Sequence, residues 1–438
     1  MKEGIHLCKV GHLIRAERIR QKMKQVVLAR GICTPSYLSK IERNQIAPSE
    51  EIATLLFNKL KMDIDTIQEK DYESEPEIEA FLNDTYKKVL TVRNDEFRKQ
   101  KLAELESRNL LFENDSHHYS FQLILLRLRL ILGIDLVARK KEIDNLSKLS
   151  SNFNPRHIYM FNVAKAIYYY SVKNRKQAIE YLEEVLHTVD DISLEVWEKA
   201  ELNYMIGLIY TADNRIFIAI EHIRKALGFF QENFLMNRVL ECYVLIGVTQ
   251  KRSEQFEEAF ESYYKAKQLC DEFNLDSEKG LVYHNLGSLY GTMGKSKEAI
   301  NFLMKAIKIK KDTRSQLISI LGIVIEYSKI KDKSSVNQWC EKGISLYIQL
   351  KDESLISYYH HFNFFKSLHS KSGLSEEIAV AAIEHFKKIQ DHQYINKYSI
   401  ALAEWYFNNR KYKLSSILYN EANRYGYIYR KNQKWEDL

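Results

Sequence analysis

Apolar residues recur every three or four positions along most of this 438-residue chain, which is the spacing of amphipathic helices. Near the N-terminus the pattern is short and interrupted, and residues 10–22, 25–30 and 50–60 each fit one helix. Ser49 is placed to cap the last of these. Only 4 Pro and 15 Gly interrupt the chain, so few positions break a helix. We therefore predict an all-α protein.

A further short helix is predicted shortly after Gly31, within the stretch GICTPSYLSKIERNQIAP. Gly31 lets the preceding helix end, and Thr34 can cap the next one. Pro35 then occupies the first helical position, where its missing N–H costs nothing. Leu38 and Ile41 give this helix one apolar face, and its other face is polar and cationic. Two helices joined by a tight glycine-containing turn are typical of a helix-turn-helix.

Three pieces of sequence carry a resemblance: Gln25, Leu-Ala at 28–29 and Ser-Lys-Ile-Glu at 39–42. This pattern resembles the repressor-type (Xre or lambda-repressor-like) helix-turn-helix domain. The stretch ICTPSYLSKIE, residues 32–42, has a turn one residue shorter than the commonest repressor form. In this it is similar to the same stretch of one subgroup. That subgroup is the PlcR and NprR type of quorum-sensing regulator in Gram-positive bacteria, which joins such a domain to tetratricopeptide (TPR) repeats.

The resemblance implies a buried pair between Arg18 and Glu42, which would tie the first helix to the end of the recognition helix. Breaking such a pair costs about 3–5 kcal/mol, because one charge is then left buried without a partner. The pair is expected to be structural.

The resemblance also implies a DNA-reading surface. Gln25 would meet a phosphate, Ser36, Tyr37 and Lys40 would face base edges, and Arg43 would face the backbone. The predicted DNA-binding residues are Gln25, Thr34, Pro35, Ser36, Tyr37, Ser39, Lys40 and Arg43.

The distribution of charge supports a DNA partner. Residues 1–62 contain 12 Lys and Arg against 5 Glu, and the rest of the chain is balanced at 53 against 53. An alternative interpretation is that Lys40 and Arg43 only form a solvated basic face. Because all the excess positive charge lies on the small N-terminal domain, the pattern favours a polyanion binder.

The second half of the sequence repeats with a period of 40 residues, and small residues return at fixed steps. Small residues at fixed steps let two antiparallel helices approach closely, while the large residues between them fill the core. Less regular copies cover residues 166–178, 324–343 and 403–422. The recurring small residues are Gly207, Gly247 and Gly287, then Ala219, Ala259 and Ala299, then Ala226, Ala266 and Ala306.

Each copy resembles a TPR helical hairpin, with a period longer than the usual ~34 residues. Eight or nine stacked hairpins would form a right-handed superhelix with a concave inner face. We predict a lambda-repressor-like helix-turn-helix domain over residues 1–70, with a fifth short helix at 63–70. A linker follows over 71–76, and a TPR-like domain for peptide or partner binding and dimerisation covers 77–438.

The concave face of a TPR array normally holds an extended peptide with side chains from the first helix of each hairpin. Asparagine suits this role because its amide can bond both N–H and C=O of a peptide backbone, and lysine or arginine can meet a carboxylate. The alternative is that the tyrosines pack between helices and the basic residues form a solvated rim. The predicted peptide-binding residues are Asn203, Tyr204, Tyr243, Lys251, Arg252, His284, Asn285 and Ser288.

Membrane and secreted classes of protein are not favoured. The N-terminus carries charges where a signal peptide needs an apolar core. The longest apolar run, from Phe121, is broken by Arg127 and Arg129 and predicts a buried helix. The five cysteines are scattered without metal-ligand or redox spacing, so we expect buried small hydrophobes in a reducing compartment. We predict a cytoplasmic protein.

No pairing of a nucleophile with a base, no metal-ligand spacing and no cofactor motif is evident. The chain is therefore not expected to be an enzyme, and neither a metal nor a cofactor is predicted.

Two hypotheses follow. The first is a transcriptional regulator, expected to be a homodimer, whose binding to a double-stranded DNA operator is controlled by a short signalling peptide in the TPR superhelix, as in quorum sensing. The second is a TPR interaction protein that sequesters a response-regulator partner, with DNA binding secondary.

Overall fold

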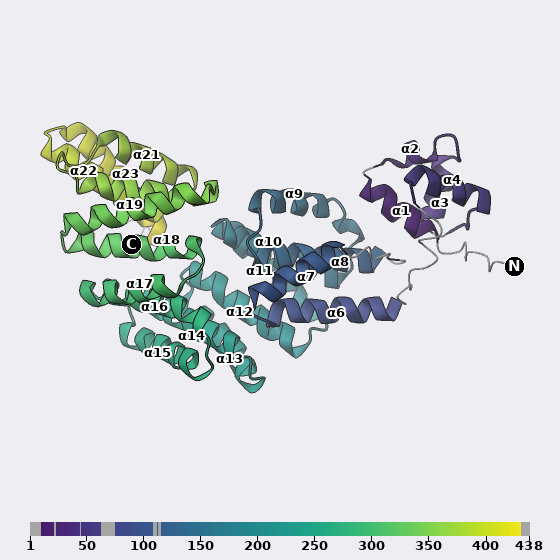
Figure 1. Ribbon diagram of the computed structural model, residues 1–438, viewed down its shortest axis with the longest axis horizontal. Helices are drawn as coiled ribbons and strands as arrows, with labels where there is room; N and C mark the ends of the chain where they lie inside the picture. The colour runs from purple at the N-terminus through teal and green to yellow at the C-terminus, as the bar shows by residue number, and fades with distance from the viewer. Residues whose placement is uncertain are drawn as a thin grey trace. The chain divides into compact units, whose positions relative to one another are not determined.

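In the computed structural model, every regular element of the described residues is a helix (Figure 1). These residues are 10–21, 23–43, 45–62, 75–107, 112 and 115–430. The chain divides into one unit that ends at Arg238 and a second that begins at Val239. The all-α class is confirmed.

The described residues of the N-terminal domain form the four short helices that the sequence predicts. Thr34 caps the third helix by accepting from the Tyr37 N–H at 3.2 Å, and Ser49 caps the fourth by accepting from the Ile52 N–H at 3.4 Å. Gly31 has φ +80°, which a residue with a side chain rarely adopts. The helices are α1 (Val10–Arg20), α2 (Gln25–Ala29), α3 (Pro35–Glu42) and α4 (Glu50–Leu60).

The predicted linker, residues 71–76, ends earlier in the structure than the sequence suggested. The next helix, α6, begins at Glu75, two residues before the predicted start at Glu77. Pro76 therefore lies in the first turn of α6, where a proline costs no hydrogen bond. The fifth short helix predicted at 63–70 lies outside the described residues, as does most of the linker.

Eighteen further α-helices follow among the described residues and form nine consecutive pairs, in agreement with the predicted eight or nine. The first unit contains α6 (Glu75–Thr91), α7 (Asp95–Ser107), α8 (Asp115–Ile131), α9 (Leu136–Ser147), α10 (Pro155–Ser171), α11 (Arg175–Thr188), α12 (Val196–Ala212) and α13 (Ile216–Glu232). The second contains most of α14 (Met236–Arg252) and then α15 (Phe256–Glu272), α16 (Asp276–Thr292), α17 (Ser296–Ile309), α18 (Thr313–Lys329), α19 (Lys333–Leu350), α20 (Ile356–Leu368), α21 (Glu376–Lys388), α22 (His392–Asn408) and α23 (Tyr412–Arg430).

The recurring small residues lie where paired helices touch. A Cβ added to Gly207 of α12 would lie 2.3 Å from Cγ1 of Ile223 on α13. A Cβ added to Gly287 would lie 2.7 Å from Cγ of Leu303. These distances are far below van der Waals contact, so glycine sets how closely each pair packs. The predicted alanines at the other two recurring positions are all fully buried: Ala219, Ala226, Ala259, Ala266, Ala299 and Ala306.

The less regular copies follow the same principle. Ala166 and Ala403 are fully buried, and a Cβ added to Gly343 of α19 would lie 2.4 Å from the Phe362 ring. Tyr419 of the last copy departs from it, because its side chain is 37% exposed. The register of the repeat therefore weakens toward α23.

The apolar run from Phe121 forms the buried helix α8, as predicted. Arg129 ends up at the edge of this core, where it pairs with Glu106 and Glu142, each at 2.8 Å. None of the helices in the described ranges combines the length and apolar character needed to cross a membrane.

Most of the described cysteines are buried, as expected. Cys242, Cys270 and Cys340 are fully buried, and burial raises the pKa of the Cys270 and Cys340 thiols to about 12. Cys33 is only half-buried, and Cys8 lies outside the described residues.

The close approach of α14 and α15 can be tested at Gly247, where an added Cβ would lie 2.5 Å from the buried Tyr263 ring. We expect Gly247→Ala to lower the free energy of unfolding by about 1–3 kcal/mol, because the ring has to move. Urea unfolding followed by circular dichroism measures this change.

Gly228→Ala on α13 is the matched control, since a Cβ there meets nothing within 4 Å. It should leave stability unchanged or raise it by up to about 1 kcal/mol, because alanine favours the helix. Equal effects of the two substitutions would contradict the close approach.

Candidate functional site

The recognition helix α3 presents a short polar face. Leu38 and Ile41 are fully buried beneath it, whereas Ser36, Lys40 and Arg43 are exposed. Thr34 and Pro35 are exposed at its start, and Ser39 is half-buried. Tyr37 is also half-buried and packs against the core of the domain, so only part of its side chain is available to a ligand.

The predicted pair between Arg18 and Glu42 is present and holds α3 against α1. Arg18 Nε donates to Glu42 Oε1 at 2.6 Å, and Nη2 donates to Oε2 at 2.8 Å. Arg18 Nη1 also donates to the Met23 carbonyl at 2.9 Å. Because the Glu42 side chain is only 1% exposed, this two-pronged pair neutralises a carboxylate shielded from water.

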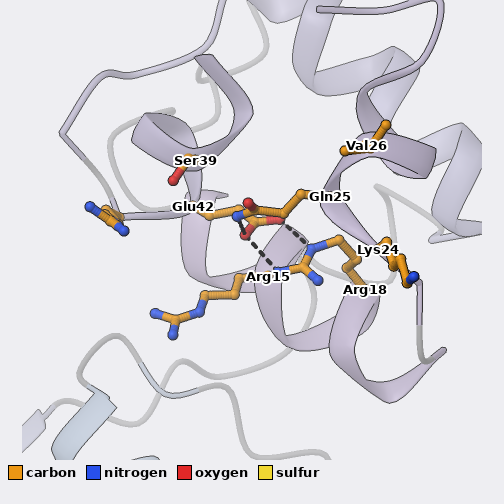
Figure 2. Close-up of a pocket in the computed structure, with 8 residues that line it drawn as sticks. Arg15, Arg18, Lys24, Gln25, Val26, Ser39 and Glu42 are labelled. Atoms are coloured by element: carbon orange, nitrogen blue, oxygen red, sulfur yellow. Dashed lines mark hydrogen bonds and ion pairs between the residues drawn. The ribbon is translucent and has the colours of Figure 1, made fainter. Parts of the chain in front are cut away.

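Gln25, the first residue of α2, also binds the Glu42 carboxylate. Its Nε2 donates to Glu42 Oε2 at 2.7 Å, so α1, α2 and α3 meet at one carboxylate (Figure 2). We call these three residues, Arg18, Gln25 and Glu42, the junction. The sequence missed this role of Gln25, and its phosphate contact stays a prediction.

A hollow of about 570 Å³ opens beside the junction (Figure 2). Lys24, which sequence reasoning missed, is exposed at its rim directly before α2, and Arg43 lies at the end of α3. Arg15 also lines the hollow, and its guanidinium pairs with Asp115 at 2.8 Å. Cations with adjacent polar groups suit a phosphate, which needs positive charge and several donors. The hollow is lined by Arg15, Arg18, Lys24, Gln25, Val26, Ser39, Glu42 and Arg43.

The two asparagines predicted to bind peptide have internal partners. Asn203 Nδ2 donates to the Lys199 carbonyl at 2.8 Å, and its Oδ1 lies 2.6 Å from His222 Nδ1. Asn285 is 8% exposed, and its Nδ2 donates to the Leu281 carbonyl at 3.0 Å. A peptide would have to compete for these amides.

The two predicted tyrosines favour the packing alternative. The Arg238 guanidinium lies 4.0 Å from the centre of the Tyr204 ring, and Tyr243 packs against the core that contains α14 to α16. Both side chains are half-buried.

The structure brings together three of the remaining predicted residues. Lys251 Nζ donates to Ser288 Oγ at 2.8 Å, and His284 lies on the same helix as Ser288. Burial lowers the pKa of Lys251 to about 8, with a further contribution from Arg252. Arg252 itself is exposed at the end of α14.

The described residues include no group of three or more His, Cys, Asp or Glu side chains that could hold a metal ion.

Comparison with known families agrees with this two-part geometry. A helix-turn-helix family model matches residues 14–67, and a tetratricopeptide repeat model matches residues 238–312. The chain is thus a helix-turn-helix protein with TPR repeats.

The transcriptional activator NprA of Geobacillus stearothermophilus is 27% identical over 415 residues, which are 91% of this chain and 98% of that protein. Together with the two family models, this similarity relates the chain to regulators that join a helix-turn-helix domain to TPR repeats.

Two solved structures share the fold. A Rap protein complexed with competence and sporulation factor has a TM-score of 0.68 at 16% identity, covering 82% of this chain and 100% of that chain. NprR in complex with its cognate peptide NprX has a TM-score of 0.63 at 18% identity, covering 79% of this chain and 98% of that chain.

The junction predicts that α3 becomes less stable when Arg18 no longer pairs with Glu42. We expect Arg18→Leu to lower the local stability of the N-terminal domain by about 3–5 kcal/mol, because it leaves the Glu42 carboxylate buried without a cation. Hydrogen–deuterium exchange of peptides covering residues 25–43 in the full-length chain measures this loss as faster exchange.

Arg30→Leu removes the same charge from an exposed position and should leave the exchange unchanged. Unchanged exchange in Arg18→Leu would show that the pair does not hold the recognition helix.

Proposed function

We propose that this protein is a DNA-binding transcriptional regulator whose activity is set by a short signalling peptide bound to its TPR-like repeats. The observation that carries the proposal is the junction, which holds a cationic recognition helix rigidly at the end of a chain related over 91% of its length to a named transcriptional activator. The function requires no catalytic step and places the protein in the cytoplasm with its operator.

At the DNA end, α3 is proposed to enter the major groove. Lys40 and Ser36 are exposed on its polar face and would reach base edges, while Arg43 follows the helix end and would meet the phosphate backbone. Lys24 extends this cationic surface from α2. Two copies are needed to read half-sites about one DNA turn apart, so the active form is proposed to be a homodimer.

At the other end, a peptide is proposed to contact several hairpins at once. Within the second unit, successive hairpins pack on one another, so a ligand that bridges several of them favours one arrangement of the hairpins over another. The peptide can shift the equilibrium only by its difference in affinity for the two arrangements. NprR, which shares this fold, is seen in complex with its cognate peptide NprX, which supports the same class of ligand here.

The proposal is tested with the full-length protein. Fragments of the source genome that it retains are sequenced to find its operator, and pools of synthetic peptides are then added while operator affinity and oligomeric state are measured. A peptide that changes either quantity supports the proposal. Absence of specific DNA retention, or of any peptide effect on a bound operator, contradicts it.

A second candidate is capture of a response-regulator partner, which is favoured by similarity to the response regulator aspartate phosphatase I of Bacillus subtilis, 20% identical over 266 residues. The full-length Lys40→Ala/Arg43→Ala double variant separates the two. Partner capture should survive in this variant, whereas operator binding should be lost.

Lys40 and Arg43 are predicted to contribute differently to DNA binding. We expect Lys40→Ala to cost about 1–3 kcal/mol on the operator and little on random DNA, because it loses a base contact. Arg43→Ala should weaken binding to both by a similar factor, because it loses a backbone contact.

Gel-shift titrations on operator and random duplexes at one fixed salt concentration measure both variants. Equal losses on the two duplexes for Lys40→Ala would remove this side chain from the reading face.

A further inference from the structure

A group of polar side chains in the second unit lies between α14, α16 and the segment from Lys310 into α18 (Figure 1 locates these helices). Lys251 Nζ donates to Ser288 Oγ at 2.8 Å. Lys310 Nζ donates to Ser319 Oγ at 2.9 Å, and this hydroxyl lies 3.1 Å from His284 Nδ1. We call these five residues, Lys251, His284, Ser288, Lys310 and Ser319, the basic cluster.

Lys310 departs from the 40-residue repeat. The equivalent residues in the two preceding copies are Phe230 and Cys270, both fully buried. A Cβ added to Gly280 would lie 2.8 Å from Lys310 Cγ, so glycine makes room for the lysine stem. The two preceding copies have Ala200 and Leu240 at that place, which leave no such room.

Two other members of the basic cluster also replace apolar residues of the repeat. Ser288 stands where the earlier copies have Leu208 and Val248, and His284 stands where the nearest copy has Val244. A packed hairpin does not need these polar side chains, because the neighbouring copies pack without them. Polar substitutions that meet in space therefore indicate a site.

The basic cluster contains two cations without a counter-ion. Neither Lys251 nor Lys310 forms a salt bridge with any carboxylate in the part of the chain that is described. Asp312 is the acid near Lys310, but it is exposed and caps α18 by accepting from the Arg314 and Ser315 N–H groups. Holding partly buried cations unpaired is costly, and an anion would remove that cost.

The titration of these groups agrees with the geometry. Burial lowers the pKa of both Lys251 and Lys310 to about 8. Burial also lowers the pKa of His284 to about 3, and the charges of Lys310 and Lys251 add to this shift, so both ammonium groups act on the same ring. His284 is therefore neutral at pH 7.

The hydrogen bonds within the basic cluster leave some N–H donors available to a ligand. Ser319 Oγ accepts from Lys310, and its hydroxyl can donate to His284 Nδ1, so the neutral ring carries its hydrogen on Nε2. Each ammonium has three N–H groups, of which Lys251 uses one and Lys310 two. Lys251, Lys310, His284 and Ser288 are all half-buried and thus reachable from solvent.

We propose that the basic cluster binds a carboxylate of the signalling peptide. A carboxylate offers two oxygens to the two ammonium groups and further lone pairs to His284 Nε2–H and the Ser288 hydroxyl. The inference rests on the proposed function and deepens it, because it makes an anionic group a requirement of the ligand. The carboxylate comes from an acidic side chain or from the peptide C-terminus.

A pH dependence follows with a definite sign. The charged groups that act on the two lysines are Arg252 and Asp312, and His284 stays neutral throughout. Only the protonated lysines attract the carboxylate, so affinity is highest near neutral pH, where the lysines are charged and the carboxylate is ionised, and it falls as the pH rises through about 8. The fall is about tenfold per lysine between pH 7 and 9, since each then loses most of its charge.

The experiment passes four pools of synthetic heptapeptides over immobilised full-length protein, and mass spectrometry identifies what is retained. The pools are unrestricted, C-terminally amidated, free of Asp and Glu, or both amidated and free of Asp and Glu. The last pool should not be retained, and whichever of the middle two is lost names the source of the carboxylate.

Lys251→Met and Lys310→Met are the variants, and Lys308→Met, exposed on α17, is the matched control. Lys251→Met and Lys310→Met should each lower the affinity for the retained peptides roughly ten- to hundredfold, as expected for loss of a charge-assisted hydrogen bond. Their melting temperatures should equal or exceed that of the natural protein, because methionine removes an unpaired cation. The control should change neither quantity.

A separate arm measures thermal stabilisation by N-acetyl-L-aspartate against sodium chloride of equal ionic strength. A shift that both lysine variants abolish supports the basic cluster even where no peptide pool is retained, and in that case the proposed function alone fails. Retention that ignores carboxylates or the lysine variants overturns the inference and leaves the proposed function standing. Absence of both retention and stabilisation overturns both.

Discussion

The repeat part of this protein depends on how closely its paired helices approach. At Gly207, Gly247 and Gly287 the facing side chain occupies the space that a Cβ would take. This contact returns every 40 residues, so it limits how far apart the two helices lie in these three pairs. A face with the same register in successive hairpins is what allows side chains far apart in the chain to converge.

The N-terminal domain has a different kind of constraint. Its helices are short, and α2 has only Leu28 and Ala29 buried. The junction holds the three helices together, because the buried Glu42 carboxylate of α3 accepts hydrogen bonds from Arg18 of α1 and Gln25 of α2. Buried charges hold such geometry well, since any movement leaves one of them unpaired.

Charge is organised at two scales. At the scale of domains, the excess of basic residues lies within residues 1–62, and the repeats are neutral overall. Within the neutral part, Lys251 and Lys310 nevertheless share one neighbourhood without a carboxylate bound to either. A balanced total thus conceals a local positive charge where a ligand can meet it, because surface acids elsewhere are screened from it by solvent.

Much of this protein follows from sequence alone. The helical class, the caps at Thr34 and Ser49 and the 40-residue repeat are local or periodic features of the sequence. The pair between Arg18 and Glu42 joins residues 24 positions apart on different helices, and it is expected from the resemblance to repressor-type domains. The tertiary structure alone decided the partner of Gln25 and the approach of both Lys251 and Lys310 to His284. Side chains 59 positions apart meet only when the twist of each hairpin on the next is set, and that twist comes from packing, which no single stretch of sequence encodes.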